Sequence, residues 1–193
     1  MFHLRAFAVE PYDNNVYLLS DPESREALLI DAANDPGRIL AELEGLSLSH
    51  ILTTHGHPDH VQAVPEVRRA TGAIFSCHQG DAEMMPLKPD LEVKDRDHFQ
   101  FGPYTLVALH TPGHTPGSLC FLIADHLFTG DTLFPGGPGN TRGQGASFPT
   151  IIKSIQSALF PLPDQTRVLP GHGKATTIGA ERSQLGTWVR RGW

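Results

Sequence analysis

Histidine and aspartate crowd into one short segment of this chain, and that segment constrains the fold more than any other feature. The run Thr-His-Gly-His-Pro-Asp-His occupies positions 54–60, directly after an apolar stretch typical of a strand. Alternate residues of an extended segment point to the same side, so His55, His57 and Asp59 can face one point in space. His60 then opens a helix, with Asp59 able to serve as its N-terminal cap. Imidazole and carboxylate groups at this density predict a metal site at the end of a strand.

Three later positions share the same local design. His114 lies in His-Thr-Pro-Gly-His-Thr-Pro-Gly, Asp131 in Phe-Thr-Gly-Asp-Thr and His172 in Leu-Pro-Gly-His-Gly. Each follows an apolar stretch and has glycine or proline beside it, and these residues end a strand and let the backbone turn sharply. Alone, each would be a weak signal. With the 54–60 segment they supply the ligands that a two-metal site needs.

Hydrophobic periodicity divides the chain into two similar halves, each with strands first and then a helix and a strand. Two sheets between layers of helices would bury both apolar faces of each sheet, so the pattern predicts an α/β sandwich. Residues 130–147 form a long glycine-rich loop, and long loops inside compact domains are usually functional. We predict strands at 3–9, 16–20, 27–30, 51–53, 73–76, 99–101, 104–109, 118–124, 127–129 and 167–169, and helices at 36–46, 60–71, 148–160 and 178–189.

Length, charge and composition narrow the class of protein. The 193 residues suit a single domain that spans positions 1–193. A formal net charge of −6 argues against a nucleic-acid partner, because such proteins usually carry a basic face. No apolar stretch approaches the ~18 residues of a membrane span and no secretion signal opens the chain, so we expect a cytoplasmic protein with no membrane partner. Cys77 and Cys120 lie among apolar residues and are expected to be reduced and buried.

The motifs THGHPDH, TPGHTPGS, GDTLF and LPGHG together resemble the metallo-β-lactamase superfamily and, within it, the glyoxalase II-like hydrolases. The resemblance covers nearly the whole chain. The C-terminal part is similar to the short bacterial form of these hydrolases, which lacks a C-terminal helical substrate domain. The resemblance implies an αββα sandwich, in which two mixed sheets are flanked by helices.

The resemblance also implies a role for each ligand-type residue. Asp59 and Asp131 would be the carboxylates of the catalytic centre, and Asp31 would support the metal shell without being a ligand. Two divalent ions are expected, zinc first, with iron and manganese as alternatives because each can occupy sites made of histidine and aspartate. The first ion would be held by His55, His57 and His114 and the second by Asp59, His60 and His172, with Asp131 and a hydroxide bridging the two.

The implied reaction is metal-dependent hydrolysis of a thioester such as S-lactoylglutathione, by attack of the bridging hydroxide. Two aspartates and one hydroxide do not neutralise two divalent ions, so the centre favours a small substrate that is anionic. A thiol leaving group has a pKa near ~8.5 and departs with little proton donation, which suits a site without an evident general acid.

Two other reactions and one non-enzymatic role are alternatives. Persulfide dioxygenases of the same superfamily use one iron, held at positions that match His55, His114 and Asp131. They commonly carry Gly-Arg-Thr-Asp in the loop after the bridging aspartate, where this chain has Gly-Asn-Thr-Arg at 139–142, which disfavours that reaction. Hydrolysis of a lactone or another ester is the second alternative. A metal-binding regulator or scaffold is disfavoured because the full set of ligands is present.

The substrate pocket is the least specified part of the sequence. Arg142 lies in the glycine-rich loop beside the predicted site, and we expect it to contact the substrate. His78 and His110 are interpreted as structural residues. The sequence does not specify an oligomeric state, although a tail containing Trp188 and Trp193 could pack on a second chain. The remaining basic residues considered for the substrate are interpreted as solvated surface charges: Lys153, Lys174, Arg182, Arg190 and Arg191.

Overall fold

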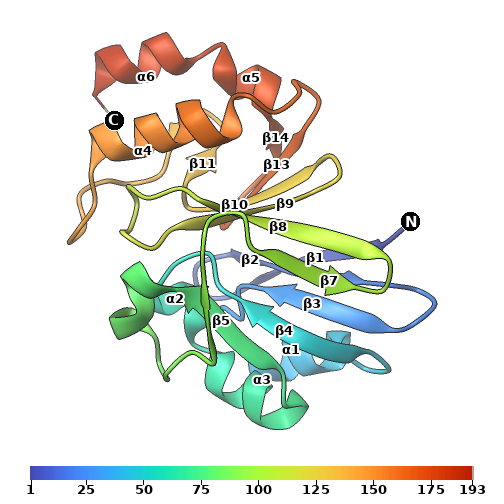
Figure 1. Cartoon of the computed structure of the whole chain (residues 1–193). Coiled ribbons are helices and arrows are strands. Elements are labelled where there is room, and N and C mark those ends of the chain that lie inside the picture. The colour runs from blue at the N-terminus through green and yellow to red at the C-terminus, as the bar shows by residue number, and fades with distance from the viewer. Residues whose placement is uncertain (193) are drawn as a thin grey trace.

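Two six-stranded sheets form the centre of the computed structural model, which describes residues 1–192 (Figure 1). The first sheet has its strands in sequence order, antiparallel from β1 to β3 and parallel from β3 to β6. Its strands are β1 (His3–Val9), β2 (Asn14–Ser20), β3 (Glu26–Ile30), β4 (Ser47–Leu52), β5 (Ile74–His78) and β6 (Leu91–Val93).

The second sheet is also mixed and has the strand order β14-β13-β10-β9-β8-β7. Only β10 and β13 are parallel among its pairs within the described residues, and the other neighbours are antiparallel. Its strands are β7 (His98–Phe101), β8 (Tyr104–His110), β9 (Leu119–Ile123), β10 (His126–Gly130), β13 (Arg167–Pro170) and β14 (Thr176–Thr177).

Helices cover the outer face of each sheet, so the sandwich has four layers (Figure 1). The predicted αββα architecture is therefore confirmed. The first sheet is covered by α1 (Pro36–Glu42), α2 (Pro58–Val61) and α3 (Val64–Thr71). The second is covered by α4 (Phe148–Ser154), its π-helical continuation η2 (Ile155–Leu159), α5 (Ile178–Arg182) and α6 (Leu185–Arg191). None of the helices in residues 1–192 is long and apolar enough to cross a membrane.

The hydrophobic core has three layers because both faces of each sheet are buried. Along β2, Leu18 faces α1 and α3 whereas Leu19 faces the second sheet. Leu28 and Leu29 of β3 divide in the same way. Alternation along a strand thus sends neighbouring leucines into different layers, and a strand covered on both faces is apolar throughout.

Several elements differ from the sequence-based prediction. The helix expected at 60–71 is broken, because the amide of Ala63 donates to the carbonyl of Ala32 (3.0 Å) and α3 restarts beyond it. The helix at 148–160 ends in a π turn, and the one at 178–189 is divided into α5 and α6. The elements not predicted are η1 (a 3-10 helix at Gln79–Met84), β6, β14 and the small hairpin of β11 (Leu133–Phe134) and β12 (Gly137–Pro138).

Two side-chain expectations have different outcomes. Cys77 and Cys120 are free and buried, as predicted, and burial raises the pKa of their thiols to about 12 and about 11. The idea that Trp188 packs on a second chain is wrong, because this side chain is buried in its own chain against Phe160. Trp193 lies outside the described residues.

Candidate metal centre

The predicted ligands lie on loops that follow the carboxyl ends of four strands. β4 leads into His55 and His57 and then into α2, whose first turn carries Asp59 and His60. The loop after β8 carries His114, the residue directly after β10 is Asp131, and the loop after β13 carries His172. The two sheets place these strand ends at one edge of the sandwich, so residues far apart in sequence meet there.

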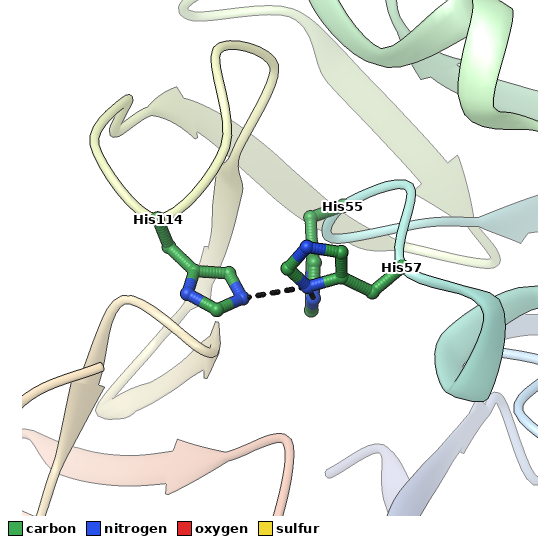
Figure 2. Close-up of side chains that lie close together, drawn as sticks. All are labelled: His55, His57 and His114. Atoms are coloured by element: carbon green, nitrogen blue, oxygen red, sulfur yellow. Dashed lines mark hydrogen bonds between the residues drawn. The ribbon is translucent and has the colours of Figure 1, made fainter. Parts of the chain in front are cut away.

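Three histidines form a first group of inward-facing nitrogens. His57 Nδ1 lies 3.0 Å from His55 Nε2 and 2.9 Å from His114 Nε2. Figure 2 shows His55 and His57 coming from one loop and His114 reaching them from another. His55 and His114 are buried, and His57 is partly exposed. Because His57 Nδ1 carries at most one hydrogen, it cannot donate to both neighbours, and a shared cation suits this arrangement better.

A second group combines Asp59 with two more histidines. His172 Nε2 lies 3.3 Å from Asp59 Oδ2 and 3.2 Å from His60 Nε2. His60 Nε2 lies 3.7 Å from the same Asp59 oxygen. The ligand atoms of this group all lie within 4.8 Å of one another, as do those of the first group, which is a spacing that one metal ion can span.

Asp131 stands between the two groups with one oxygen toward each. Its Oδ2 lies 3.6 Å from His114 Nε2, and its Oδ1 lies 3.5 Å from His60 Nε2 and 3.7 Å from His172 Nε2. Asp131 Oδ1 is buried and has no hydrogen-bond partner. A buried carboxylate oxygen without a partner is costly unless a cation satisfies it, so Asp131 fits a bridging position.

Hydrogen bonds behind two of the rings set which nitrogen faces the centre. His114 Nδ1 donates to the backbone oxygen of Asn140 (2.8 Å), and His172 Nδ1 donates to that of Tyr12 (3.0 Å). A carbonyl can only accept, so each Nδ1 carries the hydrogen and each Nε2 is the position left for a ligand bond.

Asp31 performs the same task for the other rings. His60 Nδ1 donates to Asp31 Oδ2 (2.9 Å). The Thr54 hydroxyl also donates to Asp31 Oδ2 (2.8 Å) and is then free to accept from His55 Nδ1 (3.1 Å). His55 and His60 therefore also turn Nε2 inward. Asp31 lies behind the ligand atoms rather than among them, which is the place that the resemblance implied.

The donor set as a whole fits two divalent metal ions. Five imidazole nitrogens and two carboxylates converge from four loops. Four of the rings are held in the tautomer that a metal requires, and histidine ligands of metals typically donate their other N–H to a carboxylate or a carbonyl. The set contains nitrogen and oxygen ligands only, which suits zinc, iron and manganese alike.

Protonation differs between the two groups. Burial, reinforced by the neighbouring rings, lowers the pKa of His55 and of His57, which favours the neutral form of these two rings that binds a cation. In the second group, the hydrogen bond with Asp59 raises the pKa of His172 to about 9, and the same bond lowers the pKa of Asp59. Burial opposes the charged form of His60, but Asp31, Asp131 and Asp59 together outweigh it and raise the pKa of that ring. A metal ion entering the second group must therefore displace protons.

Two residues of the centre were missed by the sequence analysis. Asn14, at the start of β2, donates its side-chain amide to Asp59 Oδ2 (3.0 Å). Asp81, on η1, accepts hydrogen bonds from Gly56 and from the loop that carries His114. Asp81 had a usable signal: like Asp131, it follows a strand and comes directly after a glycine.

The remaining candidate residues lie outside the ligand cluster. Arg142 is exposed, and its backbone amide donates to the side-chain oxygen of Asn140 (2.9 Å). The backbone carbonyl of Asn140 accepts from His114. Arg182 is not a free surface charge, because it bonds to Asp164 and to two backbone carbonyls. The stacked rings of His78 and His110 have centroids 3.9 Å apart, and neither residue belongs to a ligand group. Lys153, Lys174, Arg190 and Arg191 are exposed.

The family follows from the extent of sequence similarity. The pattern described as the metallo-β-lactamase superfamily matches residues 9–172, which is well over half of the chain. The chain belongs to the metallo-β-lactamase superfamily. The resemblance inferred from the motifs is thereby confirmed, and the fold described above is that of this superfamily of metallo-hydrolases.

Similar members of the metallo-β-lactamase superfamily carry out different reactions. Hydroxyacylglutathione hydrolase GloC from Haemophilus influenzae is 32% identical, over 93% of this chain and 95% of its own length. The human mitochondrial persulfide dioxygenase ETHE1 is 35% identical, over 86% of this chain and 68% of its own length. These identities are too close to choose between a hydrolase and a dioxygenase.

Solved structures agree with the family assignment. The BLEG-1 B3 metallo-β-lactamase superposes with a TM-score of 0.88 and 28% identity, covering 94% of this chain and 97% of that chain. TTHA1623 in a di-iron-bound form superposes with a TM-score of 0.81 and 32% identity, covering 92% and 96%. The His/Asp cluster of the present chain is suited to a dinuclear metal centre.

Proposed function

We propose that this protein is a dinuclear metallo-hydrolase that cleaves an anionic thioester such as S-lactoylglutathione. The observation that carries the proposal is Asp131, whose two carboxylate oxygens face different ligand groups while one of them lacks any hydrogen-bond partner. The first ion would be held by His55, His57 and His114, the second by Asp59, His60 and His172, and Asp131 would bridge them.

The chemistry divides between the ions and the chain. When bound, two divalent ions supply a hydroxide nucleophile at neutral pH and positive charge that stabilises the developing oxyanion. The chain holds the ligand rings in one orientation through Asp31 and two backbone carbonyls, so little reorganisation is needed during the reaction. Asn14 fixes Asp59, whose lowered pKa keeps it ionised and makes it a poor proton donor. A thiol leaving group needs little protonation, which favours a thioester over an amide.

Charge supports an anionic substrate. Two aspartates leave an excess of positive charge on a centre with two divalent ions, although the protein as a whole carries −6. We propose that Arg142 adds to this attraction, because it is exposed on the loop that holds His114 through Asn140. An Arg142→Ala variant is expected to raise KM with little change in kcat. An unchanged KM would remove Arg142 from the substrate site.

The metal and the setting of the reaction belong to the same proposal. Zinc is our first choice for the ions, with iron and manganese as alternatives, and the likeness to a di-iron structure supports iron. We propose that residues 1–193 work as one domain on a small molecule in the cytoplasm and without a nucleic-acid or membrane partner.

The test is the loss of thioester absorbance from S-lactoylglutathione, with zinc-loaded and iron-loaded protein measured in parallel. We expect rapid hydrolysis that a chelator abolishes. Absence of hydrolysis in both forms would refute the thioesterase proposal. The same measurement with Asp131→Ala reports whether the turnover belongs to this centre rather than to a contaminant.

A persulfide dioxygenase is the second candidate, favoured by the 35% identity with the human enzyme. That reaction needs one iron at His55, His114 and Asp131. The fully assembled second group around Asp59, His60 and His172 favours the hydrolase instead. Oxygen uptake by iron-loaded protein with glutathione persulfide would select the dioxygenase, and lactone or ester substrates test the remaining alternative.

A further inference from the structure

We propose that Asp81 is a positioning residue that sets the spacing of the first ligand group by tying its two loops together. The inference rests on the proposed metal centre, to which it adds a residue that none of the ligand motifs contains. Asp81 does not face the ligand nitrogens itself, so its effect would be transmitted through the backbone of the loops.

The carboxylate of Asp81 bonds to both loops of the first group at once. Its Oδ2 accepts from the backbone amide of Gly56 (2.9 Å), which lies between His55 and His57. The same oxygen accepts from the Thr115 hydroxyl (2.6 Å), and Oδ1 accepts from the amide of Gly117 (2.7 Å). Asp81 is only 1% exposed, so these bonds form away from competing water.

Close packing leaves the two loops little freedom to move relative to η1. A Cβ atom on Gly56 would lie 2.7 Å from that of Met84, and one on Gly80 would lie 2.9 Å from the backbone nitrogen of Gly117. The 3-10 helix thus lies directly against both loops. The buried carboxylate at this junction connects the loop that carries His114 to the loop that carries His57.

Different residues support the second ligand group. His60 is held by Asp31, Asp59 by Asn14, and His172 by the carbonyl of Tyr12. The first group therefore depends on Asp81 in a way that the second does not. Loss of the carboxylate should weaken metal binding by the first group more than by the second.

An aspartate is required here rather than an amide. Three donors converge on the carboxylate, and an ionised carboxylate only accepts. Asparagine has almost the same shape but would turn an NH₂ group toward at least one of these donors. Asp81→Asn thus removes part of the junction without creating a cavity.

The test is a cobalt(II) titration of metal-free Asp81→Asn, with ion number and affinity measured by chelator competition and the site identified by visible absorption. His57→Ala and His172→Ala give reference spectra for a broken first and a broken second group. We expect the affinity of the first group to fall about 10- to 100-fold and that of the second to change by less than about threefold. Asp90→Asn is the matched control, because its carboxylate accepts from Phe75 and Arg68 but contacts neither loop.

A second pair of variants keeps the inference testable should Asp81→Asn not fold. Thr115→Val removes one of the three donors and should weaken the first group, whereas Thr115→Ser keeps the hydroxyl and should bind like the wild type. The inference would be overturned if Thr115→Val and Thr115→Ser bound metal with equal affinity. It would also be overturned if Asp81→Asn left the affinity of the first group unchanged, or lowered the affinities of both groups equally. Because the readout needs no substrate, failure of thioester hydrolysis leaves it intact. If the wild-type protein did not bind two cobalt ions, the proposed metal centre on which the inference rests would be refuted instead.

Discussion

At the scale of single residues, the centre depends on side chains and glycines whose roles cannot be inferred from their spacing in the sequence. Asp31 has a left-handed backbone (φ 59°), which is uncommon outside glycine, and it is buried. Its carboxylate nevertheless accepts from the amide and hydroxyl of Thr54 and from His60. Strain of this kind persists where the surrounding bonds over-determine the conformation, and here those bonds orient a ligand.

Gly171 is a position where a methyl group should break the metal centre. A Cβ atom there would lie 2.5 Å from Asp131 Oδ1 and 2.6 Å from His60 Cε1. We expect Gly171→Ala to lose metal while remaining folded, with metal content measured by elemental analysis after dialysis. Gly143→Ala is the matched control because that site is open. Full metal occupancy in Gly171→Ala would mean that Asp131 and His60 can move apart without loss of the site.

Asp131 should be the most sensitive single residue for activity. Asp131→Ala removes the carboxylate that faces both groups, and we expect kcat/KM to fall about a thousandfold, or about 4 kcal/mol of transition-state stabilisation. His78→Ala, at a ring that stacks on His110 and belongs to neither ligand group, should keep its metal content. Empty sites in His78→Ala, or near-normal turnover in Asp131→Ala, would contradict the ligand assignment.

At the scale of elements, the position of His114 depends on how neighbouring short helices hold the loop that carries it. The loop of residues 111–117 lies between two elements. On one side Ser154 of α4 donates to the carbonyl of Pro112 (2.7 Å), and on the other Asp81 of η1 accepts from the amide of Gly117. A Cβ atom on Gly113 would lie 2.3 Å from the backbone nitrogen of Ile151, so α4 lies directly against the loop. The loop that carries His114 is therefore held by α4 on one side and by η1 on the other.

The contact between His172 and Asp59 joins the loop after β13 to α2 and should make the stability of metal-free protein depend on pH. The folded-state pKa of His172, about 9, exceeds its ordinary 6.5, so its contribution is complete below pH 6.5 and is lost as pH rises through about 9. The lowered pKa of Asp59 has the opposite sign: its contribution is present above its ordinary 3.8 and is lost in acid.

The measurement is urea unfolding of metal-free wild type and His172→Ala from pH 6 to pH 10. The wild type should be the more stable of the two at pH 6, and the difference should shrink toward pH 10. A difference that stays constant over this range would show that His172 is not protonated in the metal-free protein.

At the scale of the whole molecule, the layer between the sheets joins the two halves of the ligand set. Phe121 of β9 is fully buried in that layer and meets Phe99 edge-on at a ring-centroid distance of 6.3 Å. Each ligand group combines residues that follow a strand of the first sheet with one that follows a strand of the second. The residue from the second sheet is His114 in the first group and His172 in the second. The relative placement of the sheets is therefore a condition for the site.

Phe121→Ala should destabilise the protein by about 3–5 kcal/mol, because it removes a buried aromatic ring and leaves a cavity between the sheets. Val189→Ala, at a side chain 53% exposed on α6, should change stability by less than about 0.5 kcal/mol. Chemical denaturation of the metal-loaded forms checks both values. A cost below about 1 kcal/mol for Phe121→Ala would mean that the layer collapses to fill the space.

The sequence by itself determined the fold family and the chemical nature of the centre. Ligand residues cluster at strand ends with glycine and proline beside them, and this pattern is local, so it can be read along the chain. Apolar stretches likewise identified most strands, including β2 and β3, whose leucines divide between layers.

Only the tertiary structure decided how the centre is supported. Asn14, Asp81 and the carbonyls of Tyr12 and Asn140 act across gaps of more than twenty residues, and no local pattern reveals such partners. The break in the helix at Ala63 also comes from a contact with a distant part of the chain, the carbonyl of Ala32, which overrides helical periodicity. Hydrogen bonds and packing between distant segments are properties of the folded molecule, and they determine which nitrogen of His60, His114 and His172 faces the centre.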